Sequence, residues 1–372
     1  MNNFKTELSR KIWSSAKNNF GAENFDEFLF GDFNTVTREK KPFIRLVKKV
    51  IKRVIGYDKY RIKKLEKIFV EKYGDSLERI FDNLNPDGQN LLVELIAYRL
   101  LGYQKVKLRR NNTEYWKSLE LAQTLGDPND KYDFQCIHFI FEKFDLKPIG
   151  YDIQLYFTRI GIAIDFIIEQ YAYKISDKKI VYVEKGETVL DIGGCWGDTA
   201  LYFAHEVGEH GKVYSFEFIP GNMGFFNVNI SLNPELKSRI KLIENPVADK
   251  TGETIYYMDD GPGSKIEFAP FAEQTGFSKT ITIDDFVISN NIEQVDFIKM
   301  DIEGAEPIAL KGAIETIKKH RPKLAIAIYH SMEDFCNIPN WILDLDLGYE
   351  IYFGHYTIHR GETICFAKQK NK

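Results

Sequence analysis

The feature that most constrains the fold is a regular alternation of apolar and amphipathic segments from about residue 180 onward. ETVLDIG (187–193) has the composition of a buried strand, and GDTALYFAHEVG (197–208) carries apolar residues at helical spacing and ends in glycine. Further strands are expected at 212–218, 239–245, 295–304 and 322–330, and further helices at 220–233, 306–320 and 333–348. This alternation predicts an α/β fold with a doubly wound, mainly parallel sheet. Residues 349–356 and 362–368 predict a closing hairpin-like pair that contributes one antiparallel strand.

The first part of the chain has a different, mostly helical pattern. Residues 90–103 and 132–144 carry apolar residues at helical spacing, and the breaker segments NPDG and GDPND separate the helical pieces. We therefore divide the chain into a mainly helical N-terminal region, 1–170, and a sheet domain, 171–372. A chain of 372 residues is long enough for two such parts.

Charge and cysteine content exclude several classes of protein. Lys and Arg number 50 against 54 Asp and Glu, and the net charge of −4 gives no reason to expect a nucleic-acid partner. The four cysteines are scattered and form no CxxC pair, so neither a zinc site nor a disulfide framework is indicated. Reduced thiols predict a cytoplasmic protein. We find no secretory type of leader and no apolar run long enough to span a bilayer.

One stretch of the N-terminal region is strongly basic. Residues 43–67 place apolar side chains on one helical face and several Lys and Arg side chains off that face. A basic amphipathic helix can lie on an anionic membrane, which would put the protein at the inner face of the membrane as a peripheral protein. The alternative is a helix that packs on the core and leaves its basic side in water, and we favour this alternative.

A glycine-rich turn separates the first strand of the sheet domain from its helix. Gly193, Gly194 and Gly197 allow a ligand to approach the backbone, and Asp191 ends the strand. Glu217 ends the next strand, where a carboxylate can accept hydrogen bonds from both hydroxyls of a ribose.

The spacing of this turn argues against a dinucleotide. It reads G-G-x-x-G after an acidic residue, whereas the dinucleotide fingerprint reads G-x-G-x-x-G. An aspartate beside the turn would repel a pyrophosphate and suits a ligand with a positive centre. S-adenosylmethionine carries a sulfonium and an ammonium and no phosphate, so we predict it as the cofactor.

Several segments together resemble the FkbM family of S-adenosylmethionine-dependent methyltransferases, over about residues 170–368. They are DIGGCWGDTALYFA, GKVYSFEF, KMDIEGAEPIALKGA, AIAIYHSMEDFCNIPNWI and GHYTIHRGETICFA, of which DIEGAE with LKGA is the most specific. The resemblance implies a seven-stranded, Rossmann-like class I methyltransferase fold for 171–372, and a reaction that methylates a hydroxyl oxygen. Where many members have D-x-G-A-N-x-G, this chain has Gly194 and Cys195, which resembles a GGCWGDTA subtype of the family.

The resemblance also implies further contacts with the cofactor. Phe218 directly follows Glu217. The loop NPVADKTGE is similar to the family's adenine-side loop, which implies that Asn245 and Ala248 lie near the base. Tyr171, in the lead-in segment EQY, is expected either to cover the cofactor or to pack between the two parts of the chain.

Methyl transfer to a hydroxyl needs a group that takes up the hydroxyl proton. Histidine is the natural proton acceptor near neutral pH, so we predict His330, after the fifth strand, as the general base and His355 as the second choice. Asp301, Glu303 and Glu306 follow the fourth strand, and we expect Asp301 and Glu303 to orient the base or the acceptor.

A divalent metal is an alternative to a histidine base. Asp301, Glu303 and His330 at adjacent strand ends could together hold an ion that acidifies the hydroxyl. Their spacing matches no recognised metal signature, so a metal is possible in this reading but not favoured, and its ligands are left unknown.

These features predict an O-methyltransferase that acts on a sugar hydroxyl in surface polysaccharide or glycolipid biosynthesis. The expected partner is a carbohydrate or sugar-nucleotide acceptor, and no nucleic acid is expected. Whether the protein forms a homodimer is left open. One alternative is methylation of a natural-product, polyketide-type hydroxyl. The other, from a different class, is a methyltransferase-like scaffold in glycan assembly that has lost its activity.

Overall fold

The computed structural model describes residues 3–33, 57–133, 141–261 and 263–370. The contacts divide the chain into two compact units. The first consists of Met1–Thr113 together with Tyr356–Gly361, and the second of Glu114–His355 together with Glu362–Lys372.

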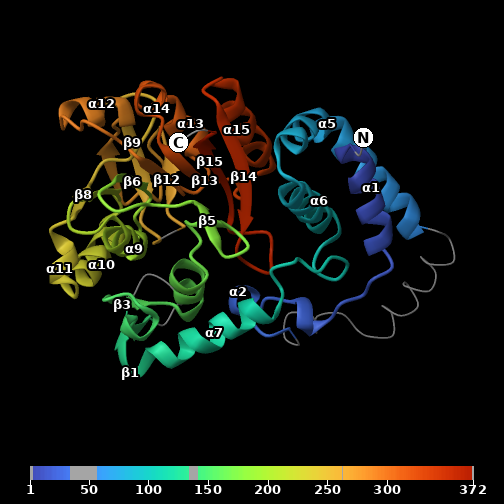
Figure 1. Cartoon of the computed structure of the whole chain (residues 1–372), viewed down its shortest axis with the longest axis horizontal. Coiled ribbons are helices and arrows are strands. Elements are labelled where there is room, and N and C mark those ends of the chain that lie inside the picture. Colours follow the sequence, from blue (N-terminus) through green and yellow to red (C-terminus); the bar gives the residue numbers. More distant parts are fainter. Residues whose placement is uncertain (1–2, 34–56, 134–140, 262, 371–372) are drawn as a thin grey trace. The chain divides into compact units, whose positions relative to one another are not determined.

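A seven-stranded sheet forms the centre of the second unit (Figure 1). Its strands run in the order β14-β15-β13-β12-β6-β7-β8. They are β6 Thr188–Ile192, β7 Lys212–Phe216, β8 Ile240–Ile243, β12 Phe297–Met300, β13 Lys323–Ala327, β14 Tyr349–His355 and β15 Thr363–Gln369. All neighbours pair in parallel except β15, which is antiparallel to both β13 and β14. The predicted doubly wound sheet with one antiparallel strand is confirmed.

The register of the parallel strands brings their carboxyl ends to one edge. Ile192, the last residue of β6, pairs with Phe216 at the end of β7 and with Met300 at the end of β12. Met300 in turn pairs with Ile326, near the end of β13. The residues that follow these four strands therefore leave the sheet side by side.

Helices cover both faces of the sheet. On one face, Phe203 of α9 lies 5.6 Å, between ring centroids, from Phe297 of β12. On the other face, Phe286 of α12 contacts the rings of Tyr214 and Phe216 of β7. The principal helices are α9 Asp198–Val207, α10 Pro220–Ser231, α12 Ile283–Ser289, α13 Glu306–Lys311, α14 Ile314–His320 and α15 Met332–Asp344. The alternation of buried side chains along each strand supplies both faces with apolar surface.

Three smaller sheets complete the second unit. Their strands are β1 Gly126–Tyr132, β2 Phe141–Asp145 and β3 Gln154–Phe157; β4 Tyr173–Ile175 and β5 Lys178–Val181; and β9 Thr254–Met258, β10 Lys265–Glu267 and β11 Gly276–Lys279. The remaining short elements are α7 Thr113–Leu125, η2 Lys147–Ile149, α8 Arg159–Gly161, the π-helical turn η3 Ile162–Ile167, and α11 Pro234–Lys237.

The helix expected over 132–144 is wrong where the structure describes this stretch, because Phe141–Asp145 forms strand β2. The reason lies in tertiary pairing. β2 pairs with β1 on one side and β3 on the other, and Phe141 packs 4.7 Å from Trp196 and 4.8 Å from Phe225, between ring centroids. Aromatic residues three positions apart fit either structure, so the pattern alone did not decide between them. Residues 134–140 lie outside the described residues.

The first unit is built from helices. They are α1 Phe4–Ser15, η1 Ala22–Asn24, α2 Glu27–Phe30, α5 Tyr57–Asn83 and α6 Pro86–Leu101. Helices α1, α5 and α6 pack on one another through apolar side chains such as Phe4 and Phe81, whose ring centroids lie 6.1 Å apart. Helix α6 begins at a proline, after an Asn85 cap that accepts from Gly88 N. The helix predicted over 90–103 is confirmed by α6.

The first unit also contains Tyr356–Gly361, which is the loop between β14 and β15. Ile358 in this segment is buried, and His359 Nε2 lies 3.5 Å from Asp26 Oδ2. The unit is therefore assembled from two stretches of chain that are distant in the sequence.

Most of the basic stretch 43–67 cannot be compared with the structure, because residues 43–56 lie outside the described residues, and 57–67 belong to α5. Membrane contact through this stretch stays a prediction. Within the ranges that the structure describes, no helix has both the length and the apolar composition that crossing a bilayer requires.

Candidate active site

The glycine turn between β6 and α9 is packed against the neighbouring strands. Gly193 has φ 90°, and a Cβ there would lie 2.0 Å from the carbonyl oxygen of Asp301. A Cβ on Gly194 would lie 2.0 Å from Ser215 Oγ. Both glycine N–H groups donate to Phe216 O, at 3.1 and 2.8 Å. Gly197 directly precedes α9. The turn thus needs glycine where it passes close to β7 and to the end of β12.

Asp191 lies beneath this turn and is fully buried. Its carboxylate accepts hydrogen bonds from Thr199 Oγ1 of α9, at 3.0 Å, and from Ser215 Oγ of β7, at 2.7 Å. It also lies 3.2 Å from Lys299 Nζ. These partners show that Asp191 ties together β6, β7, β12 and α9, while its predicted contact with a cofactor stays a prediction.

Lys299 is a charged residue in the buried strand β12, and the sequence reasoning missed it. Its side chain is 2% exposed and donates to the carbonyl oxygen of Gly193 at 2.5 Å. Burial alone would lower the pKa of Lys299, but the charges of Asp191, Asp301 and Asp198 outweigh burial and raise it. The ammonium is therefore held charged below the glycine turn. A lysine within the apolar run DFIKMD was the signal that could have revealed it.

Glu217 follows β7 and is buried beside the glycine turn. One carboxylate oxygen accepts from the backbone N–H groups of Phe218 and Ile219, both at 2.8 Å, and the other accepts from Asn222 Nδ2 at 3.3 Å. Burial raises the pKa of Glu217 to about 7, although these hydrogen bonds act in the opposite direction. The second oxygen has only one long hydrogen bond and so keeps capacity for another donor.

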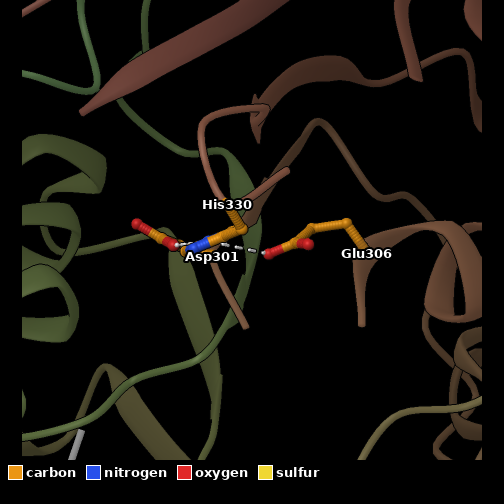
Figure 2. Close-up of side chains that lie close together, drawn as sticks. All are labelled: Asp301, Glu306 and His330. Carbon is orange, nitrogen blue, oxygen red and sulfur yellow. Dashed lines mark hydrogen bonds and ion pairs between the residues drawn. The ribbon is translucent and has the colours of Figure 1, made fainter. Parts of the chain in front are cut away.

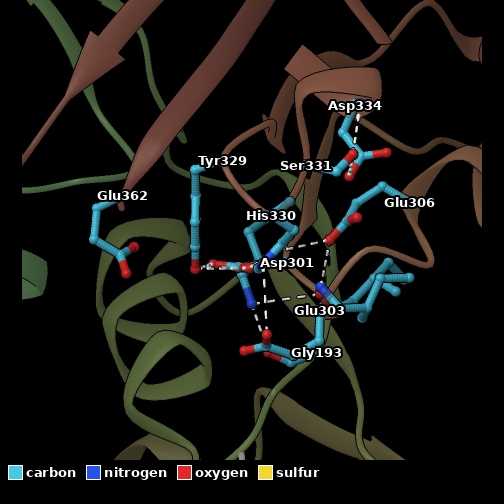
Figure 3. A network of polar contacts seen from close by, with 12 residues as sticks. Gly193, Asp301, Glu303, Glu306, Tyr329, His330, Ser331, Asp334 and Glu362 are labelled. Atoms are coloured by element: carbon cyan, nitrogen blue, oxygen red, sulfur yellow. Dashed lines mark hydrogen bonds and ion pairs between the residues drawn. The ribbon is translucent and has the colours of Figure 1, made fainter. Parts of the chain in front are cut away.

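Polar side chains converge where β12 and β13 end (Figure 3). Asp301 accepts hydrogen bonds from the hydroxyl groups of Tyr171 and Tyr329, each at 3.2 Å. His330 Nε2 lies 3.0 Å from Asp301 Oδ1. Burial would raise the pKa of Asp301, but the hydrogen bond and charge of His330 outweigh it, so this pKa is lowered. The predicted meeting of Asp301 and His330 at adjacent strand ends is confirmed.

His330 lies among three carboxylates. Besides its contact with Asp301, Nε2 lies 3.3 Å from Glu306 Oε1, and Nδ1 lies 3.5 Å from Glu303 Oε2 (Figure 2 shows Asp301 and Glu306 on either side of the ring). Burial lowers the pKa of His330, but hydrogen bonds to Asp301 and Glu306 outweigh burial and raise it to about 11. A histidine whose pKa is raised in this way is not poised to accept a proton near neutral pH. Its role as general base stays a prediction.

Glu306, rather than Glu303, forms a compact cluster with Asp301 and His330. The chain turns back after β12 through Glu303 and Gly304, which have φ 57° and 96°, and Glu306 then opens α13. The Glu306 side chain is 0% exposed, whereas that of Glu303 is 57% exposed. The candidate metal ligands expected from the sequence are thus corrected, with Glu306 in the place of Glu303, because the turn directs Glu303 outward and Glu306 inward.

The other predicted residues lie as follows. Tyr171 is buried and reaches Asp301, as described above. His355, at the end of β14, lies outside the cluster around His330, and its Nδ1 is 2.9 Å from Thr363 Oγ1. Asn245 Nδ2 donates to Lys279 O, and the buried Ala248 donates through its backbone N–H to Ile281 O. The cofactor contacts of Tyr171, Asn245 and Ala248 stay predictions.

Three further carboxyl groups, all missed from the sequence, belong to the same charged network. Burial raises the pKa of Asp198 and that of Glu362 to about 7, and it raises the pKa of Asp165 in η3 as well. Gln170 Nε2 donates to Glu362 Oε2 at 2.9 Å. In the described part of the chain, this network joins two cationic side chains, Lys299 and His330, to the carboxyl groups of Asp165, Asp191, Asp198, Asp301, Glu303, Glu306 and Glu362. This edge of the sheet therefore favours a positively charged ligand.

Comparison with a solved methyltransferase FkbM structure supports the fold. The structure of methyltransferase FkbM from Methylobacillus flagellatus KT is 20% identical, with a TM-score of 0.50, and the match covers 83% of this chain and 62% of that one. This chain therefore spans about three fifths of the length of that relative. Fibrillarin from Aeropyrum pernix with natively bound S-adenosyl-L-methionine is 14% identical, with a TM-score of 0.36, over 62% of this chain and 89% of its own. A SAM-dependent methyltransferase from Aquifex aeolicus is 16% identical, with a TM-score of 0.29, over 50% and 82%.

Comparison of sequences gives the family of the domain at residues 185–351. No curated protein matches the chain. The family model of the methyltransferase FkbM domain matches residues 185–351, a stretch that begins just before β6 and contains the glycine turn, Glu217 and the cluster of Asp301, Glu306 and His330. The seven-stranded sheet, the turn at its first strand and this match agree with one another, and the chain accordingly carries a methyltransferase domain that belongs to the FkbM family.

Proposed function

We propose that the protein is an S-adenosylmethionine-dependent O-methyltransferase that methylates a sugar hydroxyl in surface polysaccharide or glycolipid biosynthesis. The observation that carries the proposal is the position of the glycine turn beside Glu217, at the ends of the paired parallel strands β6 and β7. In doubly wound sheets this edge binds ligands, and a carboxylate at the end of the second strand can hold a ribose. The FkbM domain match includes both features.

The charged groups at this edge fit S-adenosylmethionine better than a dinucleotide. Burial raises the pKa of several carboxyl groups in the network, and a sulfonium and an ammonium nearby would favour their ionised form, whereas a pyrophosphate would oppose it. The side-chain carbonyl oxygen of Gln170 is buried and has no hydrogen-bond partner, so it can accept from an ammonium group. Glu217 would hold the ribose, and Asp165, Asp198 and Gln170 would face the cationic end of the cofactor.

When bound, S-adenosylmethionine supplies a methyl group whose carbon–sulfur bond breaks, with the electron pair remaining on sulfur, as the acceptor oxygen bonds to the carbon. The chain's own residues must hold the acceptor in line and take up its hydroxyl proton. Glu303 is an exposed carboxylate beside the cluster, 3.5 Å from His330 Nδ1, and desolvation raises its pKa. A carboxylate with a raised pKa at the solvent side can receive the proton and pass it to water.

The acceptor class rests on the resemblance of the sequence motifs to FkbM methyltransferases. We infer a hydroxyl acceptor because carboxylates, which can bind a hydroxyl and accept its proton, surround the end of β12. A panel of sugar nucleotides, glycolipids and polyketide-type alcohols, incubated with protein and methyl-labelled cofactor, tests this inference. Label on sugars supports it, and label only on polyketide-type alcohols moves the protein to the alternative enzyme class.

Calorimetric titration with S-adenosylmethionine tests the cofactor directly. We expect the wild type to bind, and Glu217→Ala to bind more weakly by about 1.5–3 kcal/mol, because a hydrogen-bonding charged group is lost. Glu235→Ala removes an exposed carboxylate on α11 and serves as the matched control with unchanged affinity. A wild-type protein that does not bind S-adenosylmethionine would instead support an inactive scaffold.

A further inference from the structure

Three side chains from three elements converge at the edge of the sheet. Asp301 follows β12, Glu306 opens α13, and His330 follows β13. One carboxylate oxygen of each acid and one ring nitrogen of His330 all lie within 4.8 Å of one another (Figure 2). Two donor atoms that lie on opposite sides of a divalent ion, each at about 2.0–2.4 Å from it, are at most about 4.8 Å apart.

One ring nitrogen of His330 is shared between two carboxylates of this cluster. Nε2 of His330 carries at most one hydrogen, yet it faces Asp301 Oδ1 at 3.0 Å and Glu306 Oε1 at 3.3 Å. Two carboxylates therefore compete for one N–H group. The same separations match neighbouring ligand atoms at right angles around an ion with bonds of about 2.1 Å, for which about 3.0 Å is expected.

The Glu306 carboxylate gives an independent indication of a missing ligand. The residue is 0% exposed, and its Oε1 already accepts from Ile302 N at 2.8 Å. Its other oxygen, Oε2, is buried and has no hydrogen-bond partner. A buried carboxylate oxygen without a partner is costly, and a cation bound by both oxygens of Glu306 would remove that cost.

Metal-binding histidines and carboxylates are usually oriented by hydrogen bonds from surrounding residues. The three side chains of this cluster have such partners. His330 Nδ1 lies 3.5 Å from Glu303 Oε2, so its N–H can point to Glu303, and a cation that displaces the proton on Nε2 would meet the Nε2 lone pair. The hydroxyl groups of Tyr171 and Tyr329 fix the orientation of Asp301. We propose that Asp301, Glu306 and His330 bind one divalent cation, with Glu303, Tyr171 and Tyr329 as positioning residues.

The mixed ligand set indicates which cation fits. Carboxylates suit Mg²⁺ and Mn²⁺, whereas imidazole suits first-row transition metals. Two carboxylates with one imidazole therefore fit a divalent transition-metal ion such as Mn²⁺ better than Mg²⁺. Three protein ligands leave positions open for a substrate oxygen.

The role of the ion rests on the proposed function. A cation beside the acceptor hydroxyl lowers the pKa of that hydroxyl, so that its proton leaves to water and its oxygen is ready to accept the methyl group. His330 then acts as a ligand that holds the ion and does not act as the proton acceptor. This role removes the conflict between the general-base prediction and the carboxylates that surround His330.

Binding of Mn²⁺ alone to the full-length, chelator-treated protein tests the site without cofactor or acceptor. Calorimetry and the loss of the free Mn²⁺ electron paramagnetic resonance signal should both report one ion per chain. Glu306→Gln keeps the shape of the side chain but removes its charge, and we expect it to weaken binding more than about 100-fold. Glu303→Gln should weaken binding by about tenfold, as expected for a residue that orients a ligand. Glu315→Gln, an exposed carboxylate on α14, is the matched control and should bind as the wild type does.

Several outcomes would overturn the site. The wild type would then bind no stoichiometric Mn²⁺, or Glu306→Gln would bind Mn²⁺ as tightly as the wild type does. A larger loss of Mn²⁺ affinity in Glu303→Gln than in Glu306→Gln would also reject the site. Thermal unfolding with and without Mn²⁺ shows whether each variant folds, and Asp301→Asn replaces Glu306→Gln if that variant does not. Titration with S-adenosylmethionine is a separate experiment. A protein that binds Mn²⁺ but not the cofactor would keep the site and reject the proposed function, and the reverse result would reject the site alone.

Discussion

Glu217, which we propose as the ribose-binding residue, opposes folding of the free protein when it is ionised. Its carboxylate is buried, and burial raises its pKa from 4.5 to about 7 in the folded chain. The folded chain binds this proton more tightly than the unfolded chain does. The contribution of Glu217 to the free energy of unfolding is therefore fully present below its unfolded pKa, and it is lost as the pH rises through about 7. Above that pH the folded protein must keep a buried carboxylate ionised.

We therefore expect Glu217→Gln to become more stable than the wild type as the pH rises from about 4.5 to about 7, by on the order of 1–3 kcal/mol. Glutamine can still accept from Phe218 N and Ile219 N, so the local hydrogen bonds are kept. Urea unfolding of both proteins at pH 5 and pH 8 measures the difference. A gap in unfolding free energy that does not change between these pH values would show that Glu217 does not titrate as described.

At the scale of elements, the glycine turn fixes the distance between β6 and the end of β12. We expect Gly193→Ala to destabilise the protein by several kcal/mol and to weaken cofactor binding, because its Cβ would lie 2.0 Å from Asp301 O and its φ is 90°. Chemical denaturation and calorimetry measure the two effects. The close approach cannot be relieved without moving the exit of β12.

Gly186→Ala is the matched control for this substitution. Gly186 has nearly the same φ, 87°, but a Cβ there would meet nothing within 4 Å. It should cost only about 1–2 kcal/mol, from backbone conformation alone, and leave binding unchanged. Equal losses for the two variants would mean that backbone conformation, not close packing, makes glycine necessary at position 193.

Elements also show what the sequence could and could not predict. The strands of the large sheet were predictable because each is a local apolar run, and the meeting of Asp301 with His330 followed from parallel strands that end at one edge. The inward position of Glu306 was not predictable, because it depends on left-handed backbone at Glu303 and Gly304. The pairing of Lys299 with Asp191 was missed because it crosses between strands, and β2 was missed because pairing with two neighbours decided its structure.

At the scale of the whole molecule, the first unit depends on a segment that lies far away in the sequence. Ile358 is 1% exposed within Tyr356–Gly361, which belongs to the unit of α1, α5 and α6. We expect Ile358→Ala to destabilise that unit by about 2–5 kcal/mol, because it leaves a cavity in a packed core. Hydrogen exchange measured by mass spectrometry should show faster exchange in α1 and α6.

Ile288→Ala provides the comparison, because Ile288 is 72% exposed and its truncation leaves no cavity. Exchange in α1 and α6 should then match the wild type. If Ile358→Ala accelerates exchange only in β14 and β15, the loop contributes to its own hairpin and not to the helical unit.

The two-segment construction of the first unit also bears on biosynthesis. Residues 1–113 leave the ribosome before Glu114–His355, and Tyr356–Gly361 is made only after that stretch. At about 5–20 residues per second this delay is on the order of ten to fifty seconds. Strand β15, which fits between β13 and β14, is made later still, so the large sheet also stays open during the delay. Nascent chains that stall before residue 356 would expose the cores of both units at once, which makes them clients for chaperones and proteases.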